Sequence, residues 1–376
     1  MATKASKNNK SIVGGVSQRA RRSVRFIDLF SGCGGLTAGA VSAIQEAGLK
    51  PAISLAIDNN RGAIEVYRQN FAQFGDVVCS SIDEYVDCSR AAKKLISHET
   101  RALDSIARVD LMLAGPPCQG HSNLNNSSRR SDPRNLLYWA PVRAAMHLRP
   151  KVILIENVPG VTHAQEGVID GAREHFLRSG YCVAESTIEL VALGVPQLRK
   201  RHVLVATLKP FDMAEFLLRS MRRGPNTVLQ AIADLEDRAG ISESPEFKTT
   251  KLSPDNVRRI DYLFDNDIFD LPNSMRPRCH RDKDHSYVSM YGRMHPNKPA
   301  QTITSGFGSM GQGRFVHPTR RRMITAREAA RIQGFGDDFS FENVREVTSL
   351  REMIGNAVPP ALSRVFVSEF IRAGHL

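Results

Sequence analysis

Short apolar runs alternate with amphipathic stretches over the first half of this chain, from residue 24 to about 207. The apolar runs have the length and the β-branched content of buried strands. The strands predicted from them are Val24–Phe30, Pro51–Ile57, Val77–Ser80, Val109–Ala114, Lys151–Ile155, Tyr181–Leu190 and His202–Ala206. Stretches of helical period lie between them, such as Thr37–Ala47, which Gly48 closes. Repeated strand–helix units predict an α/β fold, a mostly parallel, doubly wound sheet with helices on both faces.

The pattern changes after about residue 209. Residues 287–315 are rich in Gly, Ser, Thr and Met, which is typical of short strands and loops. Helical period returns after a capping box from Thr325 to Glu328, and again at Pro359–Gly374, an amphipathic helix that we expect to pack back on the first domain. The predicted divisions are a basic, disordered arm (1–23), an α/β domain (24–208), an irregular domain (209–345) and a returning C-terminal segment (346–376).

Composition and charge narrow the class of partner. The chain has 376 residues, of which 41% are hydrophobic, enough for two domains with a sizeable core. No apolar stretch reaches the ~20 residues that cross a bilayer, so no membrane partner is expected. The net charge of +12 favours a polyanion. Two arginine clusters suit phosphate contacts, although a solvated surface would also explain them; they are Arg276, Arg278, Arg281 and Arg293, then Arg314, Arg320, Arg321, Arg322, Arg327 and Arg331.

The six cysteines follow neither Cys-x-x-Cys spacing nor a small secreted framework, which favours a reducing compartment. Cys279, His280 and His285 offer three irregularly spaced ligands, so we expect no metal site.

One cysteine is a candidate nucleophile. Cys118 lies in Gly115-Pro-Pro-Cys-Gln-Gly-His-Ser122, directly after a predicted buried strand. Open α/β sheets bind ligands at the carboxyl ends of their strands, which is where this loop begins. Two prolines fix the backbone before the thiol and Gly120 frees it afterwards. A buried structural cysteine is the alternative.

Other chemistry-bearing residues stand at comparable positions. Glu156 ends a predicted strand, where a helix cap or an ion pair would also explain it. Ser31–Gly35 is a glycine turn between strand and helix, suited to close approach of a ligand, but it lacks the dinucleotide spacing Gly-x-Gly-x-x-Gly. Asp58 ends the next strand and could bind ribose hydroxyls or cap a helix. Arg199 and Arg201 lie on one side of an extended stretch.

Together these segments resemble the DNA (cytosine-5) methyltransferase family of the bacterial type. The resemblance rests on six motifs in the family's order: Asp28-Leu-Phe-Ser-Gly-Cys-Gly-Gly35, Gly115-Pro-Pro-Cys-Gln-Gly120, Glu156-Asn-Val158, Gln197-Leu-Arg-Lys-Arg201, Arg327-Glu-Ala-Ala-Arg-Ile-Gln-Gly-Phe335 and Gly355-Asn-Ala-Val-Pro359. They cover the chain except the arm and residues 209–290. The resemblance implies the S-adenosylmethionine-dependent methyltransferase fold, with 209–345 as the target-recognition domain.

The resemblance implies a role for each matched residue. Cys118 would attack carbon 6 of a flipped cytosine, Glu156 would hold N3 and the exocyclic amine, and Arg201, with Arg199, would complete the catalytic set. The implied methyl donor is S-adenosyl-L-methionine, and the donor-binding residues would be Phe30, Gly32, Cys33, Gly35, Asp58, Asn59, Ser81, Ile82, Pro117, Leu137 and Asn356. The implied DNA contacts are Ser122, Arg134, Gln197 and Arg322.

The implied setting is the bacterial cytoplasm, with double-stranded DNA as substrate, a monomeric enzyme and a cognate restriction endonuclease as a possible partner. Three positions depart from the family's pattern. Asn59 replaces an aromatic residue that stacks on adenine, Ser81-Ile82 replaces an aspartate that binds the adenine amine, and His121 replaces a phenylalanine.

Three alternatives share the donor fold. A tRNA-methylating branch carries a Cys-Phe-Thr signature that residues 209–320 lack. A catalytically silent DNA-binding module would have no need of Cys118, Glu156 and Arg201 together. Methyltransferases of exocyclic amines use Asn or Asp before Pro-Pro, and Gly-Pro-Pro-Cys cannot perform their chemistry.

Overall fold

The first half of the chain builds one seven-stranded sheet. The computed structural model describes residues 22–91, 93–117, 133–163, 167–221, 226–238, 243–282 and 289–376. The strands of the sheet are β1 (Ser23–Leu29), β2 (Lys50–Asp58), β3 (Gly75–Cys79), β4 (Leu111–Ala114), β5 (Val152–Asn157), β6 (Cys182–Glu189) and β8 (Lys200–Thr207). Each coincides with a strand predicted from the sequence, and every end lies within two residues of its predicted position, so the predicted sheet is confirmed.

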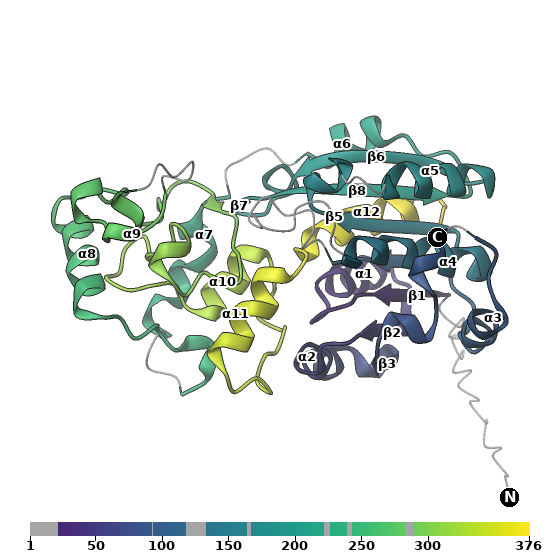
Figure 1. The fold of residues 1–376 in the computed structure, drawn as a ribbon, viewed down its shortest axis with the longest axis horizontal. Helices are drawn as coiled ribbons and strands as arrows, with labels where there is room; N and C mark the ends of the chain where they lie inside the picture. The colour runs from purple at the N-terminus through teal and green to yellow at the C-terminus, as the bar shows by residue number, and fades with distance from the viewer. Residues whose placement is uncertain are drawn as a thin grey trace, which may run out of the picture.

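The order of the strands places their carboxyl ends together. The order is β3-β2-β1-β4-β5-β8-β6, and β1 to β5 run parallel. β8 runs antiparallel to both β5 and β6, so the start of β8 lies beside the end of β5. The residues that end β1, β2 and β5 therefore share one edge with the residues that begin β8 (Figure 1).

Helices cover both faces of the sheet, as predicted. Apolar residues of α1, α2 and α12 form one core with one face, and those of α3, α4 and α5 form a second core with the other face. The helices of the chain are α1 (Gly35–Glu46), α2 (Arg61–Phe71), α3 (Ser97–Asp104), α4 (Trp139–Leu148), α5 (Val168–Arg178), α6 (Met213–Ser220), α7 (Val228–Ile232), α8 (Pro254–Asp265), α9 (Arg278–Arg281), α10 (Ala326–Gln333), α11 (Val347–Asn356) and α12 (Pro360–Arg372).

The last helix packs against the first, as its amphipathic pattern predicts. Ser363 in α12 donates its hydroxyl to the Leu36 carbonyl at 2.6 Å. A Cβ added to Gly39 would lie 1.9 Å from the Pro360 carbonyl oxygen, so only glycine allows this approach. Residues more than 300 positions apart thereby complete one layer of the α/β fold.

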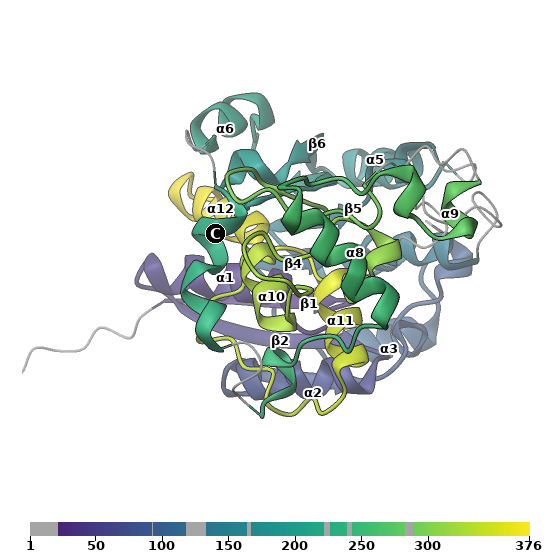
Figure 2. The ribbon, with the colours of Figure 1, turned by 90° about the vertical axis from the view of Figure 1, so that its left-hand side faces the viewer.

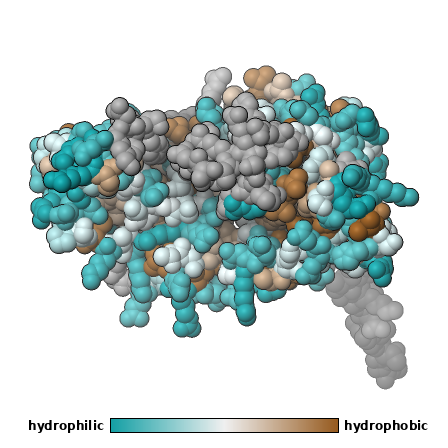
Figure 3. All heavy atoms as spheres, in the orientation of Figure 1, coloured by the Kyte–Doolittle hydropathy of each residue, from teal (hydrophilic) through white to brown (hydrophobic). Residues whose placement is uncertain are grey.

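Helix α6 lies beside β6, and the remaining helices, α7 to α11, lie beyond the carboxyl ends of the strands (Figures 1 and 2). A two-stranded parallel sheet, β7 (Gln197–Leu198) with β9 (Ala300–Gln301), joins this part to the large sheet. The predicted capping box is confirmed, because Thr325 Oγ1 accepts from the Glu328 amide and Glu328 accepts from the Thr325 amide. Hydrophilic side chains cover most of the surface seen in Figure 3. Among the described residues, no helix combines the length and apolar character needed to cross a bilayer.

The arginine clusters hold the second part of the molecule together. Arg321 pairs with Asp261 and Asp265, and Arg322 makes a two-pronged contact with Glu328 at 2.7 and 2.8 Å. The same pattern extends to Arg314 with Asp270, Arg327 with Glu246, Arg331 with Asp234 and Asp337, and Arg293 with Asp267. The structure thus gives these guanidinium groups acidic partners within the chain, which their density along the sequence did not predict.

Candidate active site

Glu156 and Arg201 meet where β5 ends and β8 begins. The antiparallel register sets Glu156 opposite Val203, so these two side chains lie on the same face of the sheet. Arg201 is two residues before Val203 and therefore points to that face as well. Arg201 Nε lies 2.5 Å from Glu156 Oε1, and the two side chains are 12% and 7% exposed. This contact is an ion pair whose angles do not meet hydrogen-bond geometry. Glu156 Oε1 therefore has no hydrogen-bond partner among the described residues.

The Glu156 carboxyl is suited to holding a proton. Burial raises its pKa, and the positive charges of Arg201 and Arg199 offset only part of that rise. A carboxyl whose pKa is raised keeps its proton to higher pH, and a protonated carboxyl can donate a hydrogen bond or a proton to a basic ring nitrogen.

The segment before the candidate nucleophile lies against this pair. A Cβ on Gly115 would stand 3.7 Å from Glu156 Oε2, and Asn157 Nδ2 donates to the Pro116 carbonyl at 3.2 Å. Pro117 is half-buried at the end of this segment. Cys118, Ser122 and His121 lie outside the described residues. The structure therefore brings Glu156, Arg201 and the approach to Cys118 together.

The glycine turn and the end of β2 form a second wall of the same edge. Gly32 donates its amide to Asp58 Oδ2 at 2.9 Å, and Asn60 donates its amide to Asp58 Oδ1 at 2.8 Å. Phe30 and Gly32 both have positive φ, 60° and 52°, which turns the backbone sharply before α1. One aspartate thus fixes the turn while keeping further lone pairs for a ligand.

The C-terminal segment closes this turn. A Cβ on Gly35 would lie 2.1 Å from the Val358 carbonyl oxygen, so residue 35 must be glycine for the two backbones to meet. Asn356, an exposed residue at the end of α11, is two positions before Val358. The structure thereby brings the expected donor-binding positions at 30–35, 58 and 356 to one region.

Polar atoms without partners show that this region suits a polar ligand. Asp28 Oδ1 and Ser31 Oγ are buried and have no hydrogen-bond partner among the described residues. Asp28 Oδ2 accepts from Thr37 Oγ1 at 2.7 Å, and Thr37 in turn contacts Tyr67 Oη at 2.7 Å. Buried polar atoms in folded proteins almost always have partners, so these two favour a bound group. The residues fit S-adenosylmethionine, a ligand with ribose, amino and carboxylate groups.

The other residues expected to bind the donor differ in how far they are exposed. Asn59 is exposed and Leu137 is half-buried. The Ser81 hydroxyl contacts Asp83 at 3.0 Å, and Ile82 is buried in the core of the α4 face. Cys33 is 3% exposed and packs in the α1 core, so its backbone is the part that can face a ligand. Burial raises the pKa of the Cys33 thiol to about 12, which excludes it as a nucleophile at neutral pH.

Two residues expected at the site are buried in a network of protein contacts. Gln197 is fully buried, and its amide contacts Gln333 and the Ile303 backbone. Arg199 is 3% exposed and donates to backbone carbonyls of Ile303, Gly355 and Ala357. Both side chains are therefore held by protein groups, and the charge of Arg199 still acts on the Glu156 carboxyl. Arg134, by contrast, is exposed.

Sequence reasoning missed two partners in these networks. Gln333 lies within the motif Arg327–Phe335, but nothing in the sequence pattern predicts its hydrogen bond with Gln197. Asp28 lies inside an apolar strand, and a charged residue in such a strand is the signal that could have revealed its buried network with Thr37 and Tyr67.

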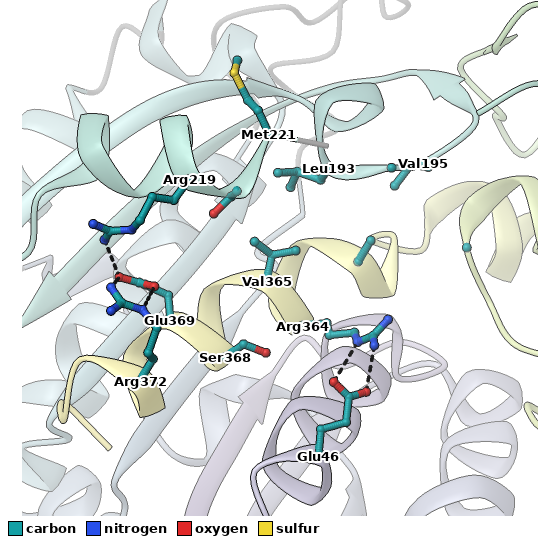
Figure 4. A pocket seen from close by; sticks show the side chains of 14 residues that line it. Glu46, Leu193, Val195, Arg219, Met221, Arg364, Val365, Ser368, Glu369 and Arg372 are labelled. Atoms are coloured by element: carbon teal, nitrogen blue, oxygen red, sulfur yellow. Dashed lines mark hydrogen bonds and ion pairs between the residues drawn. The ribbon is translucent and has the colours of Figure 1, made fainter. Parts of the chain in front are cut away.

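A separate cleft of about 570 Å³ lies between α6 and α12, and none of the expected site residues lines it (Figure 4). Its floor is apolar, with Leu193, Val195 and Val365. The charged groups on its rim pair with one another, Arg219 and Arg372 with Glu369 and Arg364 with Glu46. Within the described ranges, no group of three or more His, Cys, Asp or Glu residues is arranged to hold a metal ion.

Comparisons with known proteins agree with this geometry. The family model described as C-5 cytosine-specific DNA methylase matches residues 24–372. The Type II methyltransferase M1.BsuMI of Bacillus subtilis is 42% identical over 351 residues, 93% of this chain and 81% of that protein. The Type II methylase M.HgiDII of Herpetosiphon aurantiacus is 30% identical, over 92% of this chain and 94% of that protein.

Solved structures share the fold. A putative DNA modification methyltransferase encoded within a prophage of E. coli superposes with a TM-score of 0.63 at 24% identity, over 93% of this chain and 99% of that one. The Dnmt2 methyltransferase of S. pombe gives the same TM-score at 16% identity, over 94% of this chain and 100% of that one.

Fold and site thus define an S-adenosylmethionine-dependent α/β methyltransferase. This chain belongs to the C-5 cytosine-specific DNA methylase family. It is a DNA (cytosine-5) methyltransferase that takes its methyl group from S-adenosyl-L-methionine.

Proposed function

We propose that this enzyme methylates carbon 5 of a flipped cytosine in a specific duplex sequence, with Cys118 as nucleophile, Glu156 as acid and Arg201 as the cation beside the ring. The observation that carries the proposal is the Glu156–Arg201 pair at the junction of β5 and β8, next to the segment that leads to Cys118. Flipping is required because the reacting face of the base is stacked in a duplex.

Each residue has a defined task in this chemistry. The Cys118 thiolate adds to carbon 6, so a sulfur–carbon bond forms and the carbon 5–carbon 6 double bond opens. Glu156, whose pKa burial raises, donates its proton to N3 and accepts a hydrogen bond from the exocyclic amine. Arg201 holds Glu156 in place and supplies positive charge beside the ring. Carbon 5 is then an enamine carbon that can form a bond to an electrophilic methyl group.

S-Adenosylmethionine supplies that methyl group as a sulfonium-bound electrophile. The residues proposed to hold it are the turn at Phe30–Gly35, Asp58 at the end of β2, and Asn356 after α11, with contributions from Asn59, Ser81, Ile82, Pro117 and Leu137. The methyl group would leave S-adenosylhomocysteine behind as its bond to sulfur breaks. A general base then takes the carbon 5 proton, the double bond re-forms, the Cys118 thiolate is expelled, and N3 returns its proton to Glu156.

The decisive experiment compares two cysteine variants. Cys118→Ser is expected to abolish transfer of a labelled methyl group to DNA and to retain donor binding in calorimetry. Cys182→Ser is the matched control, because Cys182 is exposed at the start of β6, the opposite edge of the sheet. Duplex DNA carrying 5-fluorocytosine should trap an adduct with the native enzyme, since no carbon 5 proton can leave. Full activity of Cys118→Ser, or methylation of tRNA in preference to DNA, would contradict the proposal.

The biological setting follows from the same proposal. We expect the enzyme to act as a monomer in the bacterial cytoplasm, with Ser122 and Arg134 among its DNA contacts and a restriction endonuclease as its functional counterpart. The proposed division is a basic arm (1–23), a catalytic domain (24–208), a target-recognition domain (209–345) and a returning segment (346–376). Bisulfite sequencing of DNA from cells that express the enzyme would report both its activity and its target sequence.

A further inference from the structure

Arg199 ties three distant segments together through one guanidinium group. Its Nη1 donates to the Ile303 carbonyl at 2.9 Å, just after β9. Its Nη2 donates to the Ala357 carbonyl at 3.2 Å, and both nitrogens reach the Gly355 carbonyl at 3.4 Å. The side chain is 3% exposed. Arg199 therefore joins the entry to β8, the loop after β9 and the segment after α11.

A second buried residue joins the same segments. Gln197 Nε2 donates to Gln333 Oε1 at 2.7 Å, and Gln197 Oε1 accepts from the Ile303 amide at 2.8 Å. Gln333 Nε2 donates to the Ile354 carbonyl at 2.6 Å. The loop and the helix end also touch directly, because a Cβ on Gly355 would lie 2.1 Å from the Ser305 amide nitrogen.

This junction adjoins both halves of the proposed active site. Asn356, a proposed donor-binding residue, stands between the two carbonyls of Gly355 and Ala357 that Arg199 holds. Arg201 is two residues from Arg199 and pairs with Glu156, and the charge of Arg199 itself acts on the Glu156 carboxyl. Ile303 lies in the proposed target-recognition domain.

We propose that Arg199 is a positioning residue that couples donor binding to DNA binding. The inference rests on the proposed function, since it takes residues 355–357 as part of the donor pocket and the segment around Ile303 as part of the DNA-binding domain. A ligand that orders residues 355–357 orders the Ile303 loop through the shared guanidinium, so the second ligand loses less conformational entropy on binding. A planar fork of five donors can hold several carbonyls at once, whereas the single ammonium of lysine cannot.

The test measures binding and needs no methyl transfer. The Kd of a fluorescent duplex carrying the target sequence is measured by anisotropy with and without saturating S-adenosylhomocysteine, the demethylated donor. In the native enzyme we expect the ligand to tighten DNA binding by about fivefold or more, and the duplex to tighten ligand binding by the same factor. Arg199→Lys should bring both factors close to one.

Arg327→Lys is the matched control. Arg327 is another buried arginine, and its contacts with the Phe339 carbonyl and with Glu246 involve none of the three segments. It should keep the native coupling factor. Gln333→Glu is a second test variant, in case Arg199→Lys does not fold, because it loses the amide that reaches Ile354 and should weaken the coupling in the same direction.

Three results would overturn the proposal: no coupling in the native enzyme, full coupling in Arg199→Lys or Gln333→Glu, or equal loss in Arg327→Lys. Failure of the proposed function is distinguishable, since it would appear as methyl transfer by Cys118→Ser whatever the coupling factor.

Discussion

Two buried carboxyl groups, Glu156 and Asp28, define the chemistry of this protein at the scale of single residues. Each lies near the carboxyl end of a parallel strand, and burial raises the pKa of each. Glu156 has an arginine partner, whereas Asp28 is held by the Thr37 hydroxyl. The first is therefore poised for proton donation, and the second carries a cost whenever it ionises.

Glu156→Gln should reduce methyl transfer by roughly 10²- to 10⁴-fold, because an amide cannot give up a proton to N3. The shape of the side chain is preserved, so the Kd of the donor measured by calorimetry should change by less than about threefold. That is well below the tenfold change to which one pKa unit corresponds. Glu174→Gln, on the exposed face of α5, provides the control. Near-native activity of Glu156→Gln would remove Glu156 from the mechanism.

Asp28→Asn should stabilise the protein at alkaline pH. Burial raises the pKa of Asp28 from 3.8 to about 7, so between these values the folded protein holds a proton that the unfolded chain releases. The free energy of unfolding therefore falls as pH rises through that window. Asparagine does not ionise, so at pH 8 the variant should gain roughly 1–3 kcal/mol relative to the native protein, and this gain should shrink towards pH 4.

The measurement is urea denaturation at pH 4, 6 and 8, with Asp76→Asn in an exposed part of β3 as control. A difference between Asp28→Asn and the native protein that does not depend on pH would contradict the assignment.

The candidate site could be predicted in part from single residues. Glu156 follows from its place at the end of a strand, because strand ends in a parallel sheet meet at one edge. Arg201 follows from the resemblance of its motif to the family. The burial of Gln197 and Arg199 could not be predicted, since a polar side chain in an extended stretch has the same pattern whether it faces solvent or another domain. Arg199 is buried because Ile303 and Gly355 pack against it, and these residues lie 104 and 156 positions away in the sequence.

At the scale of elements, α3 is fixed to α4 by one buried ion pair. Arg143 donates to both carboxylate oxygens of Glu99 at 2.5 and 2.6 Å, and also to the carbonyls of Ala91 and Lys93. Glu99 accepts in addition from the amides of Asp87 and Ile96. Both side chains are at most 1% exposed, so the pair closes the segment between β3 and β4 against the sheet.

Arg143→Met should destabilise the protein by roughly 3–5 kcal/mol, because it leaves the Glu99 carboxylate buried without its cation. The double variant Glu99→Gln/Arg143→Met should cost less than the sum of the single changes, as expected for two groups in contact. Guanidinium denaturation measures all three. The exposed pair Arg178 and Glu174 in α5 gives the reference cycle, for which a coupling of at most about 0.5 kcal/mol is expected. Additivity within the buried pair would refute this role.

The elements of the first half were predictable because their apolar runs are long enough to show a period. The two-residue strands β7 and β9 and the one-turn helices α7 and α9 were not predicted, since so few residues carry no period. Their conformation depends on tertiary contacts, such as the pairing of Gln197 with Ala300 that defines the small sheet.

At the scale of the whole molecule, the number of basic residues overstates the cations available to DNA. The 51 Lys and Arg residues include arginines whose guanidinium groups already pair with acids of the same chain, such as Arg321 and Arg322, whereas the net charge of +12 is what remains after acids and bases cancel. Composition cannot separate these from surface cations, because pairing depends on which acidic residues the fold brings near.

Arg322→Met should therefore leave the salt dependence of DNA affinity unchanged while lowering stability by about 1–3 kcal/mol, through the loss of its contact with the buried Glu328. Arg134→Met is the contrasting variant, since Arg134 is an exposed residue and a proposed DNA contact. It should reduce the slope of log K against log salt by about one. Anisotropy titrations between 50 and 200 mM salt would check both. A shallower slope in Arg322→Met would restore that residue to the DNA interface.

The contact between α1 and α12 also sets the order in which the protein can mature. The hydrogen bond between Ser363 and the Leu36 carbonyl joins residues 327 positions apart. At ~5–20 residues per second, the ribosome synthesises Ser363 roughly 15–65 s after Leu36. Throughout that interval the side of α1 that packs on α12 has no cover, and exposed apolar surface of this kind is what chaperones bind. The glycine turn at Ser31–Gly35, which is proposed to bind the donor, is complete only when Val358 packs against Gly35. Methylation is thus withheld until synthesis is almost finished, and a broken chain would regain it only if its two pieces reassociate through these helices.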